Sequence, residues 1–147
     1  MTIALRSQRT ATALLTLGCV ATADQLSKSA TADLPPDTVA FIHPLRNHAF
    51  SLQLLNAPRA TEITLMLLIL TISTAWAVKR IQQGRLHPAA AGLIIGGCAS
   101  NIVDRVLLGS VRDFLRLGHV VINIADIAIL TGILLISVPR RRHRVRG

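Results

Sequence analysis

The chain has 147 residues, of which 51% are hydrophobic, 3% aromatic and 16% charged, and its mean hydropathy is +0.52. Soluble domains carry about a quarter charged residues, whereas residues 10–23, 63–78 and 86–103 carry none and residues 117–139 carry only Asp126. Because each helix of a soluble bundle needs a polar face, this distribution excludes such a bundle. The sequence predicts an all-α integral membrane protein, with residues 1–147 in one domain.

The first apolar run predicts a transmembrane helix over about residues 10–29. Arg6 and Arg9 precede this run, and residues 21–23 have an A-x-A pattern, so the segment also imitates a cleaved secretory signal. Asp24 and Lys28 continue the helix at i,i+4 spacing, which favours a retained membrane helix.

An outer segment is predicted over residues 30–59, because Pro35-Pro36 ends any helix there. Residues 38–42 and 49–54 are predicted as short strands, and residues 43–48 as the turn between them. Such a hairpin would form a small β-rich segment on the outer membrane surface.

Three more apolar runs predict transmembrane helices over about residues 60–78, 88–108 and 120–138. Pro88 suits the first turn of the third helix. At about 20 residues, each run is just long enough to cross a bilayer. The chain is therefore predicted to cross the membrane four times.

The formal net charge is +9, from 16 Lys and Arg against 7 Asp and Glu, and the sequence pI is near 11.6. In a soluble protein this charge would suggest a nucleic-acid partner. With four crossings, however, ten basic residues fall on one side, which is the positive-inside pattern for two cytoplasmic termini. We therefore expect membrane lipids, and no nucleic acid, as partners. The ten are Arg6, Arg9, Lys79, Arg80, Arg85, Arg140, Arg141, Arg142, Arg144 and Arg146.

Three carboxylates lie inside predicted membrane helices: Asp24, Asp104 and Asp126. A charge at the centre of a membrane helix costs roughly 2.5–3.5 kcal/mol, so such residues are functional candidates. At ~1.5 Å per residue, Asp104 and Asp126 lie ~6–9 Å below the outer interface, and Asp24 lies at a similar depth. Three helices are therefore expected to place a carboxyl in one layer near the outer face.

Two Asn-x-x-Asp units lie on consecutive predicted helices, one from Asn101 to Asp104 and one from Asn123 to Asp126. An amide one turn before an acid can donate a hydrogen bond to it. Two acids within ~6 Å of each other would share a proton and act as base and acid on a water. Small residues at positions 92, 96 and 100 lie on the face that ends in Asp104, which lets another helix approach. The alternative is an interhelical polar pair that only sets packing.

No metal, disulfide or cofactor is expected. His43, His48 and His119 have a spacing that matches no metal motif, and Cys19 and Cys98 both lie inside apolar runs.

Four stretches of the chain carry a recognisable pattern: residues 24–28, 96–105, 111–114 and 122–126. They resemble the lipoprotein signal peptidases, also called signal peptidase II. The family pattern is G-N-x-x-D-R, then V-x-D, then F-N-x-A-D, and here Ser100 and Ile122 stand where the family usually has Gly and Phe. In the outer segment the family shows N-x-G-A-A-F-S against residues 45–51, and only a shift of the loop lets Asn47 replace the family's Asn. The matching stretches are Asp24-Gln25-Leu26-Ser27-Lys28, Gly96-Gly97-Cys98-Ala99-Ser100-Asn101-Ile102-Val103-Asp104-Arg105, Val111-Arg112-Asp113-Phe114 and Ile122-Asn123-Ile124-Ala125-Asp126.

The resemblance implies a membrane aspartic endopeptidase without a cofactor, with Asp104 and Asp126 as the catalytic pair. It would cleave diacylglyceryl-modified prolipoproteins just before the lipidated Cys, at the outer edge of a bacterial cytoplasmic membrane. Asp113 is expected to be a structural hydrogen-bonding residue of an outer loop. The residues expected to bind substrate or support the site are Asp24, Lys28, Asn101, Arg105, Asn123 and Asn47.

Two other functions are compatible with the sequence. The same carboxylates suit a small proton- or ion-conducting membrane protein, which would need polar residues that continue to the inner side. A noncatalytic scaffold related to the peptidase would keep the fold without cleaving anything.

Overall fold

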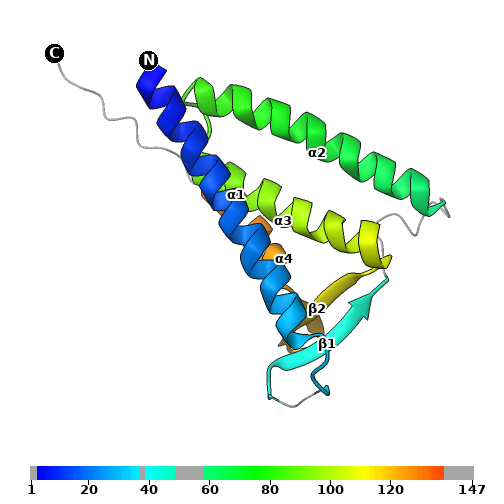
Figure 1. The fold of residues 1–147 in the computed structure, drawn as a ribbon. Helices are drawn as coiled ribbons and strands as arrows, with labels where there is room; N and C mark the ends of the chain where they lie inside the picture. Colours follow the sequence, from blue (N-terminus) through cyan, green and yellow to red (C-terminus); the bar gives the residue numbers. More distant parts are fainter. Residues whose placement is uncertain (1–2, 37–38, 49–57, 138–147) are drawn as a thin grey trace.

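The computed structural model describes residues 3–36, 39–48 and 58–137. The helices run side by side and the strands gather at one end of them, which we call the sheet end (Figure 1). The opposite end, where residues 83–87 join two helices, is called the turn end. The elements in chain order are α1 (Ile3–Thr31), β1 (Ile42–Asn47), α2 (Arg59–Gln82), α3 (Pro88–Leu108), β2 (Val111–Leu117), β3 (Val120–Ile122) and α4 (Ile124–Ser137).

Helix α3 is the central helix, because small residues on two of its faces let α1 and α4 approach closely. A β-carbon added at Gly96 would lie 2.8 Å from the carbonyl oxygen of Leu17 on α1. One added at Gly97 would lie 2.6 Å from the carbonyl oxygen of Ala125 on α4. Both approaches need a residue without a side chain. The predicted stripe of small residues thus faces α1, and it brings the carboxylates of three helices to one level.

Helix α2 packs more loosely than α3. Its most apolar window is 6% buried, against 44% for that of α3. Its buried residues, Ala77 and Ile81, join Leu86 and Ala91 in an apolar cluster near the turn end. At the sheet end, the Arg59 guanidinium donates to the carbonyl oxygens of Arg105 and Val106 in the last turn of α3, where a helix leaves carbonyls open to outside donors.

The helix bounds agree best with the sequence where local signals are strong. Helix α3 covers the predicted residues 88–108, with Pro88 in its first turn. Helices α1 and α2 extend beyond their predicted bounds. The predicted span over residues 120–138 is wrong at its start: residues 120–122 form β3, because Asn123 caps the helix that follows. Two helices, α2 and α3, are long and apolar enough to cross a membrane, and α4 is a shorter apolar helix within the described residues.

The sheet is antiparallel and has the order β1-β2-β3. The predicted turn over residues 43–48 is wrong, because residues 42–47 form β1. The partner of β1 is β2, from the segment between α3 and α4, with Leu45 opposite Asp113. This pairing satisfies the backbone of β1 and builds a three-stranded sheet, which is more stable than the isolated hairpin that the sequence predicted. The predicted strand over residues 49–54 lies outside the described residues. Of the other predicted strand, over residues 38–42, Ile42 belongs to β1 and forms an isolated bridge with Val39.

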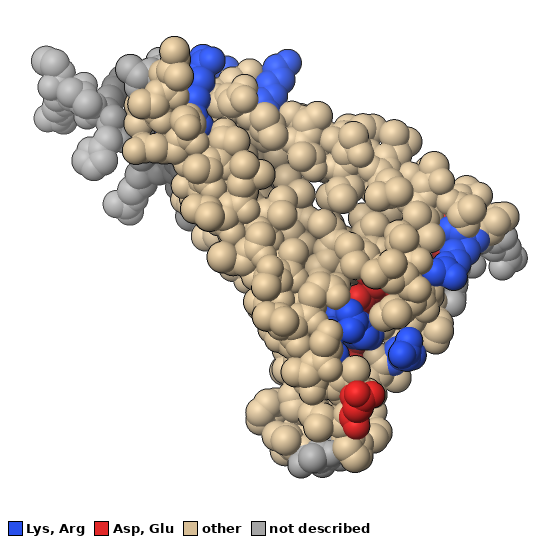
Figure 2. Space-filling view, in the orientation of Figure 1, with Lys and Arg blue, Asp and Glu red and all other residues tan. Residues whose placement is uncertain are grey.

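Charged residues gather at the two ends of the molecule. Figure 2 shows blue side chains at the turn end, an uncharged surface over the middle, and both signs at the sheet end. At the turn end, Arg9 of α1 lies against Gly84, and Arg80 lies over the ring of Trp76 at 5.4 Å. The uncharged middle separates these cations from the polar residues of the sheet end.

Candidate active site

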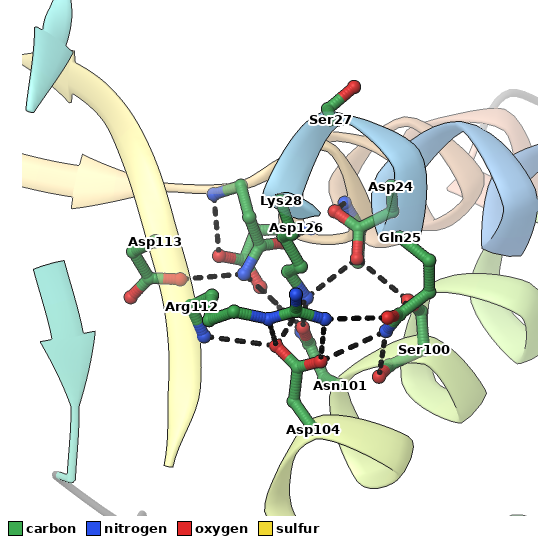
Figure 3. A network of polar contacts seen from close by, with 12 residues as sticks. Asp24, Gln25, Ser27, Lys28, Ser100, Asn101, Asp104, Arg112, Asp113 and Asp126 are labelled. Carbon is green, nitrogen blue, oxygen red and sulfur yellow. Dashed lines mark hydrogen bonds and ion pairs between the residues drawn. The ribbon is translucent and has the colours of Figure 1, made fainter. Parts of the chain in front are cut away.

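The sheet end holds a buried polar network that joins α1, α3, α4 and the sheet (Figure 3). A buried polar group without a partner costs about 1–3 kcal/mol, so these side chains are expected to bond one another. Their contacts meet that expectation. The buried polar members of the network are Asp24, Lys28, Ser100, Asn101, Asp104, Asp113 and Asn123.

Lys28 lies at the centre of the network and is fully buried. Its Nζ atom is 2.6 Å from Asp24 Oδ2 and 3.3 Å from Asp104 Oδ2. It also donates to Asn101 Oδ1 at 2.8 Å. One cation from α1 therefore compensates two acids and binds one amide, and it couples α1 to α3.

Asp24 does more than pair with Lys28 one turn along α1. Its Oδ2 atom accepts a hydrogen bond from Ser100 Oγ of α3 at 2.7 Å. Its Oδ1 atom accepts one from the Ala125 N–H at the start of α4, at 2.9 Å. An acid near a helix N-terminus is favoured by the exposed N–H groups there. Asp24 therefore joins three helices.

Asp104 is surrounded by N–H donors. Its Oδ1 atom accepts from Gln25 Nε2 at 3.0 Å and from Arg112 Nη2 at 2.8 Å. Its Oδ2 atom accepts from the Arg112 backbone N–H at 3.0 Å and from Arg112 Nε at 3.3 Å, in addition to the Lys28 ion pair. A carboxylate has about four lone-pair positions. The five donors therefore occupy the oxygens of Asp104, and its side chain is only 1% exposed.

The amide of Asn101 binds the acid of the other Asn-x-x-Asp unit. Its Nδ2 atom donates to Asp126 Oδ1 at 2.9 Å, and its Oδ1 atom accepts from Asn123 Nδ2 at 3.2 Å. Asp104 therefore reaches Asp126 through two intervening side chains, Lys28 and Asn101. A separation of ~6 Å between Asp104 and Asp126, the distance expected of a shared-proton pair, stays a prediction.

The second unit, Asn123 to Asp126, is a capping box at the start of α4. Asn123 Oδ1 accepts from the Asp126 N–H at 2.9 Å, and Asp126 Oδ2 accepts from the Asn123 N–H at 3.3 Å. This reciprocal pair satisfies backbone donors that the first turn of a helix leaves open. It also fixes the half-buried Asp126 carboxyl beside Asn123.

Asp113 of β2 is the second acid bonded to Asn123. Its Oδ1 atom accepts from Asn123 Nδ2 at 2.6 Å, and its Oδ2 atom accepts from Asn47 Nδ2 of β1 at 2.9 Å. Burial raises the pKa of the Asp113 carboxyl, and the charge of Asp126 raises that pKa further, while the two amide donors and Lys28 oppose the rise. Asp113 and Asp126 thus contact one residue, and the charge of Asp126 acts on the Asp113 carboxyl.

A cavity of about 260 Å³ opens onto Asp113 between the end of α1 and β1, and its wall includes Arg46 and Arg112. Arg105, by contrast, lies half-buried on the other side of Asn47, where it lines a pocket of about 40 Å³ with Glu62. Among the described residues, no group of three His, Cys, Asp or Glu side chains is placed to hold a metal ion. The carboxyls of the network are groups that can act on a water as base or acid.

The structure brings most of the predicted site residues into one network. Asn47 joins it through Asp113, whereas Arg105 lies at its edge, in the pocket beyond Asn47. Sequence reasoning missed Gln25, Ser100 and Arg112. Each of the three lies inside a stretch that carried the family resemblance, and that position was the available signal. Their partners are far along the chain, so no spacing rule could identify their role.

The sequence of the chain is similar to that of known proteins. The family model described as signal peptidase (SPase) II matches residues 16–139. A lipoprotein signal peptidase of Azoarcus sp. (strain BH72) is 49% identical over 57 residues, which are 35% of this chain and 32% of that protein. One of Cupriavidus taiwanensis is 42% identical over 76 residues, which are 48% of this chain and 43% of that protein. These matches extend over a third to a half of the curated relatives' length.

Solved structures agree in fold. A structure described as a bacterial membrane enzyme, determined by the in meso method at 1.9 Å resolution, has a TM-score of 0.69 and 24% sequence identity over 86% of this chain and 90% of that one. A second one, at 2.3 Å resolution, has a TM-score of 0.68 over 86% and 85% of the two chains. Because the family model covers most of the chain, from α1 to α4, the chain belongs to the signal peptidase II family.

Proposed function

We propose that this chain is a membrane aspartic endopeptidase that removes signal peptides from diacylglyceryl-modified prolipoproteins. The family membership and the lipoprotein signal peptidases that match it support this activity. The observation that carries the chemistry is the contact of two acids with one residue: Asn123 bonds both Asp113 and Asp126.

The pair that the geometry favours is Asp113 with Asp126, in place of Asp104 with Asp126. Each of the favoured acids accepts hydrogen bonds from two described donors, so each retains lone pairs for a water or a peptide. Asp104 accepts from five donors and is buried. Asp104 is therefore better suited to holding α1, α3 and β2 together than to activating a water.

The reaction then follows from the two carboxyls. Asp113 is the acid of the pair and Asp126 the base; burial and the neighbouring charge of Asp126 raise the pKa of the Asp113 carboxyl, which favours its protonated form. Asp126 takes a proton from a water as the water attacks the peptide carbonyl, and Asp113 donates its proton to the carbonyl oxygen. In the second step Asp126 gives its proton to the amide nitrogen, Asp113 takes a proton back from a hydroxyl of the gem-diol, and the C–N bond breaks to give the new amine and the carboxyl end. The remaining residues hold the pair: Asn101 and Asn123 orient Asp126, while Asp24 and Lys28 fix the helices that carry it.

We further propose that residues 1–147 form one peptidase domain that crosses the bacterial cytoplasmic membrane four times, with both termini in the cytoplasm. Successive helices alternate in direction. Arg59 at the start of α2 contacts the end of α3, and α4 runs against α3, since Gly97 meets Ala125 and Ala90 meets Gly132. Helix α1 runs parallel to α3, since Gly92 meets Ala13 and Gly96 meets Leu17. The five described basic residues of the predicted inner set precede or follow the apolar runs at the turn end, which supports a cytoplasmic turn end. A reporter fused after Gly147 should be active in the cytoplasm, and activity only outside would refute this topology.

Proton or ion conduction is not favoured. A conducting path would need polar groups through the bundle, but the described core at the turn end consists of Ala77, Ile81, Leu86 and Ala91.

The test of the activity is a cleavage assay in detergent. Purified protein is incubated with a lipidated prolipoprotein, and the released signal peptide is measured. The wild-type chain should release the peptide and Asp126→Asn should not, with a prolipoprotein that lacks the lipid as the substrate control. Absence of release by the correctly inserted wild-type chain would contradict the proposal.

A further inference from the structure

Arg112 of β2 bonds the buried network through both its backbone and its side chain. Its Nη2 atom bonds Asp104 Oδ1 at 2.8 Å and Gln25 Oε1 at 2.6 Å, and its Nε atom bonds Asp104 Oδ2 at 3.3 Å. Its backbone N–H also donates to Asp104 Oδ2, at 3.0 Å. Both the main chain and the side chain of one residue are thus held by one carboxylate, and Figure 3 shows the guanidinium between Asp104 and Gln25.

The contacts of Arg112 affect the orientation of its neighbour in β2, Asp113. Arg112 immediately precedes Asp113, and neighbouring side chains of a strand point to opposite faces. Holding Arg112 toward α1 and α3 therefore turns Asp113 toward Asn123 and Asn47, to which it bonds. Strand pairing alone does not fix this orientation, because a shift of the register by one residue would exchange the side chains of the two faces.

The pairing of β1 with β2 adds an independent argument. Arg46 lies directly opposite Arg112 in the register, and like charges in this position destabilise a strand pair. Arg46 is exposed, whereas the Arg112 side chain is 19% exposed and forms an ion pair with Asp104. The ion pair with Asp104 therefore offsets a repulsion that Arg112 itself brings to the start of β2.

We propose that Arg112 is a positioning residue: by fastening the start of β2 to Asp104 and Gln25, it sets the place of the Asp113 carboxyl relative to Asp126. This inference rests on the proposed function, since it takes Asp113 and Asp126 as the reacting pair. It assigns the buried Asp104 the role of an anchor for β2. Arginine suits this role better than lysine, because its planar fork can bond an acid and an amide at once.

The test compares Arg112→Ala and Arg112→Lys with Arg116→Ala. Arg116 lies on the same face of β2 and bonds His43 at 2.6 Å, so it is a matched control within the strand. A misplacement of about 1 Å can cost roughly 10²-fold in rate. We expect Arg112→Ala to lower kcat by ~10–100-fold with KM nearly unchanged, because positioning acts on the chemical step. Arg112→Lys should be intermediate, and Arg116→Ala near normal.

Hydrogen–deuterium exchange of residues 110–117 supplies a measurement that needs no activity. Arg112→Ala should speed exchange in this segment, because the strand loses its anchor, whereas Arg116→Ala should leave the 111–113 amides unchanged. If the alanine variant does not insert into the membrane, kcat and exchange are both measured on Arg112→Lys, which keeps the positive charge but lacks the planar guanidinium.

The outcomes separate this inference from the proposed function. A wild-type chain that cleaves, with Arg112 variants that keep full kcat or lose only substrate affinity, would overturn the positioning role alone. An equal loss in Arg116→Ala would also overturn it. A wild-type chain that does not cleave would contradict the proposed function, and the exchange data would then decide whether Arg112 anchors β2.

Discussion

The two Asn-x-x-Asp units have the same spacing in the sequence and opposite roles in the structure. The first lies in the last turns of α3, where Asn101 and Asp104 bond residues of other elements. The second begins α4, where Asn123 and Asp126 bond each other's backbone as a capping box. A motif that lies past the first turn of a helix has its side chains free for other elements, whereas a motif at a helix start is used first by the helix itself.

The acids of the two units differ accordingly. Asp104 is enclosed by five donors from α1 and β2, and it stabilises the contact between them. Asp126 is half-buried with two described donors, and it shares Asn123 with Asp113. Depth and spacing therefore identify candidate acids, while the number of donors around each acid indicates which one can react.

The largest effect is expected for the acids that share Asn123. Asn has nearly the shape of Asp but cannot act as base or acid, so Asp126→Asn and Asp113→Asn should each lower cleavage by at least ~10²–10⁴-fold. Signal-peptide release at equal membrane levels is the measurement. Near-normal cleavage by either variant would show that its carboxyl is structural.

Asp104→Asn is expected to affect stability more than chemistry. Removing one partner of a buried ion pair costs about 3–5 kcal/mol, and the lower end applies here because Lys28 keeps Asp24. The variant should unfold at a lower temperature in detergent and retain measurable cleavage. Complete loss of cleavage at an unchanged Tm, together with an active Asp113→Asn, would restore the pair of Asp104 and Asp126 that the sequence predicted.

A smaller effect is expected from the amides. Asn123→Ala removes the cap of α4 and should cost ~0.5–2 kcal/mol, whereas Asn123→Ser keeps a capping oxygen and should cost little. Both variants lose the hydrogen bond to Asp113, so both should cleave more slowly. Thermal unfolding and cleavage measured on the same samples separate the two roles. Equal stability of the two variants would contradict the capping assignment.

The smallest effect is a shift of the pH profile. Cleavage that needs protonated Asp113 falls as pH rises through its pKa, which burial already raises. Asn47 stabilises the ionised form through its hydrogen bond, so Asn47→Leu should raise this pKa further. One hydrogen bond is worth ~1 kcal/mol, so the alkaline limb of kcat/KM should move up by less than about one pH unit. A limb that stays or moves down would contradict the assignment of Asp113 as the acid.

Local and repeated features of the chain could be predicted from the sequence. The third helix was predicted at its observed bounds, because an uncharged run, Pro88 at the start and small residues along one face are signals within a few turns of each other. The same features indicated close packing against another helix, which proved to be α1. The layer of carboxylates followed from counting residues along helices of known rise.

Contacts between distant segments could not be predicted in this way. The sheet pairs residues 42–47 with residues 111–117, and no local pattern encodes which strand will be the partner. Asp113 was predicted as a structural hydrogen-bonding residue of an outer loop; it lies in β2, and its bond to Asn47 exists only once that pairing forms. Helices form through interactions between residues a few positions apart, so local hydrophobic composition was enough to predict them. The choice between acids depends on their donors. Only the packing of distant elements brings five donors from α1 and β2 to Asp104 and leaves Asp113 and Asp126 with two described donors each.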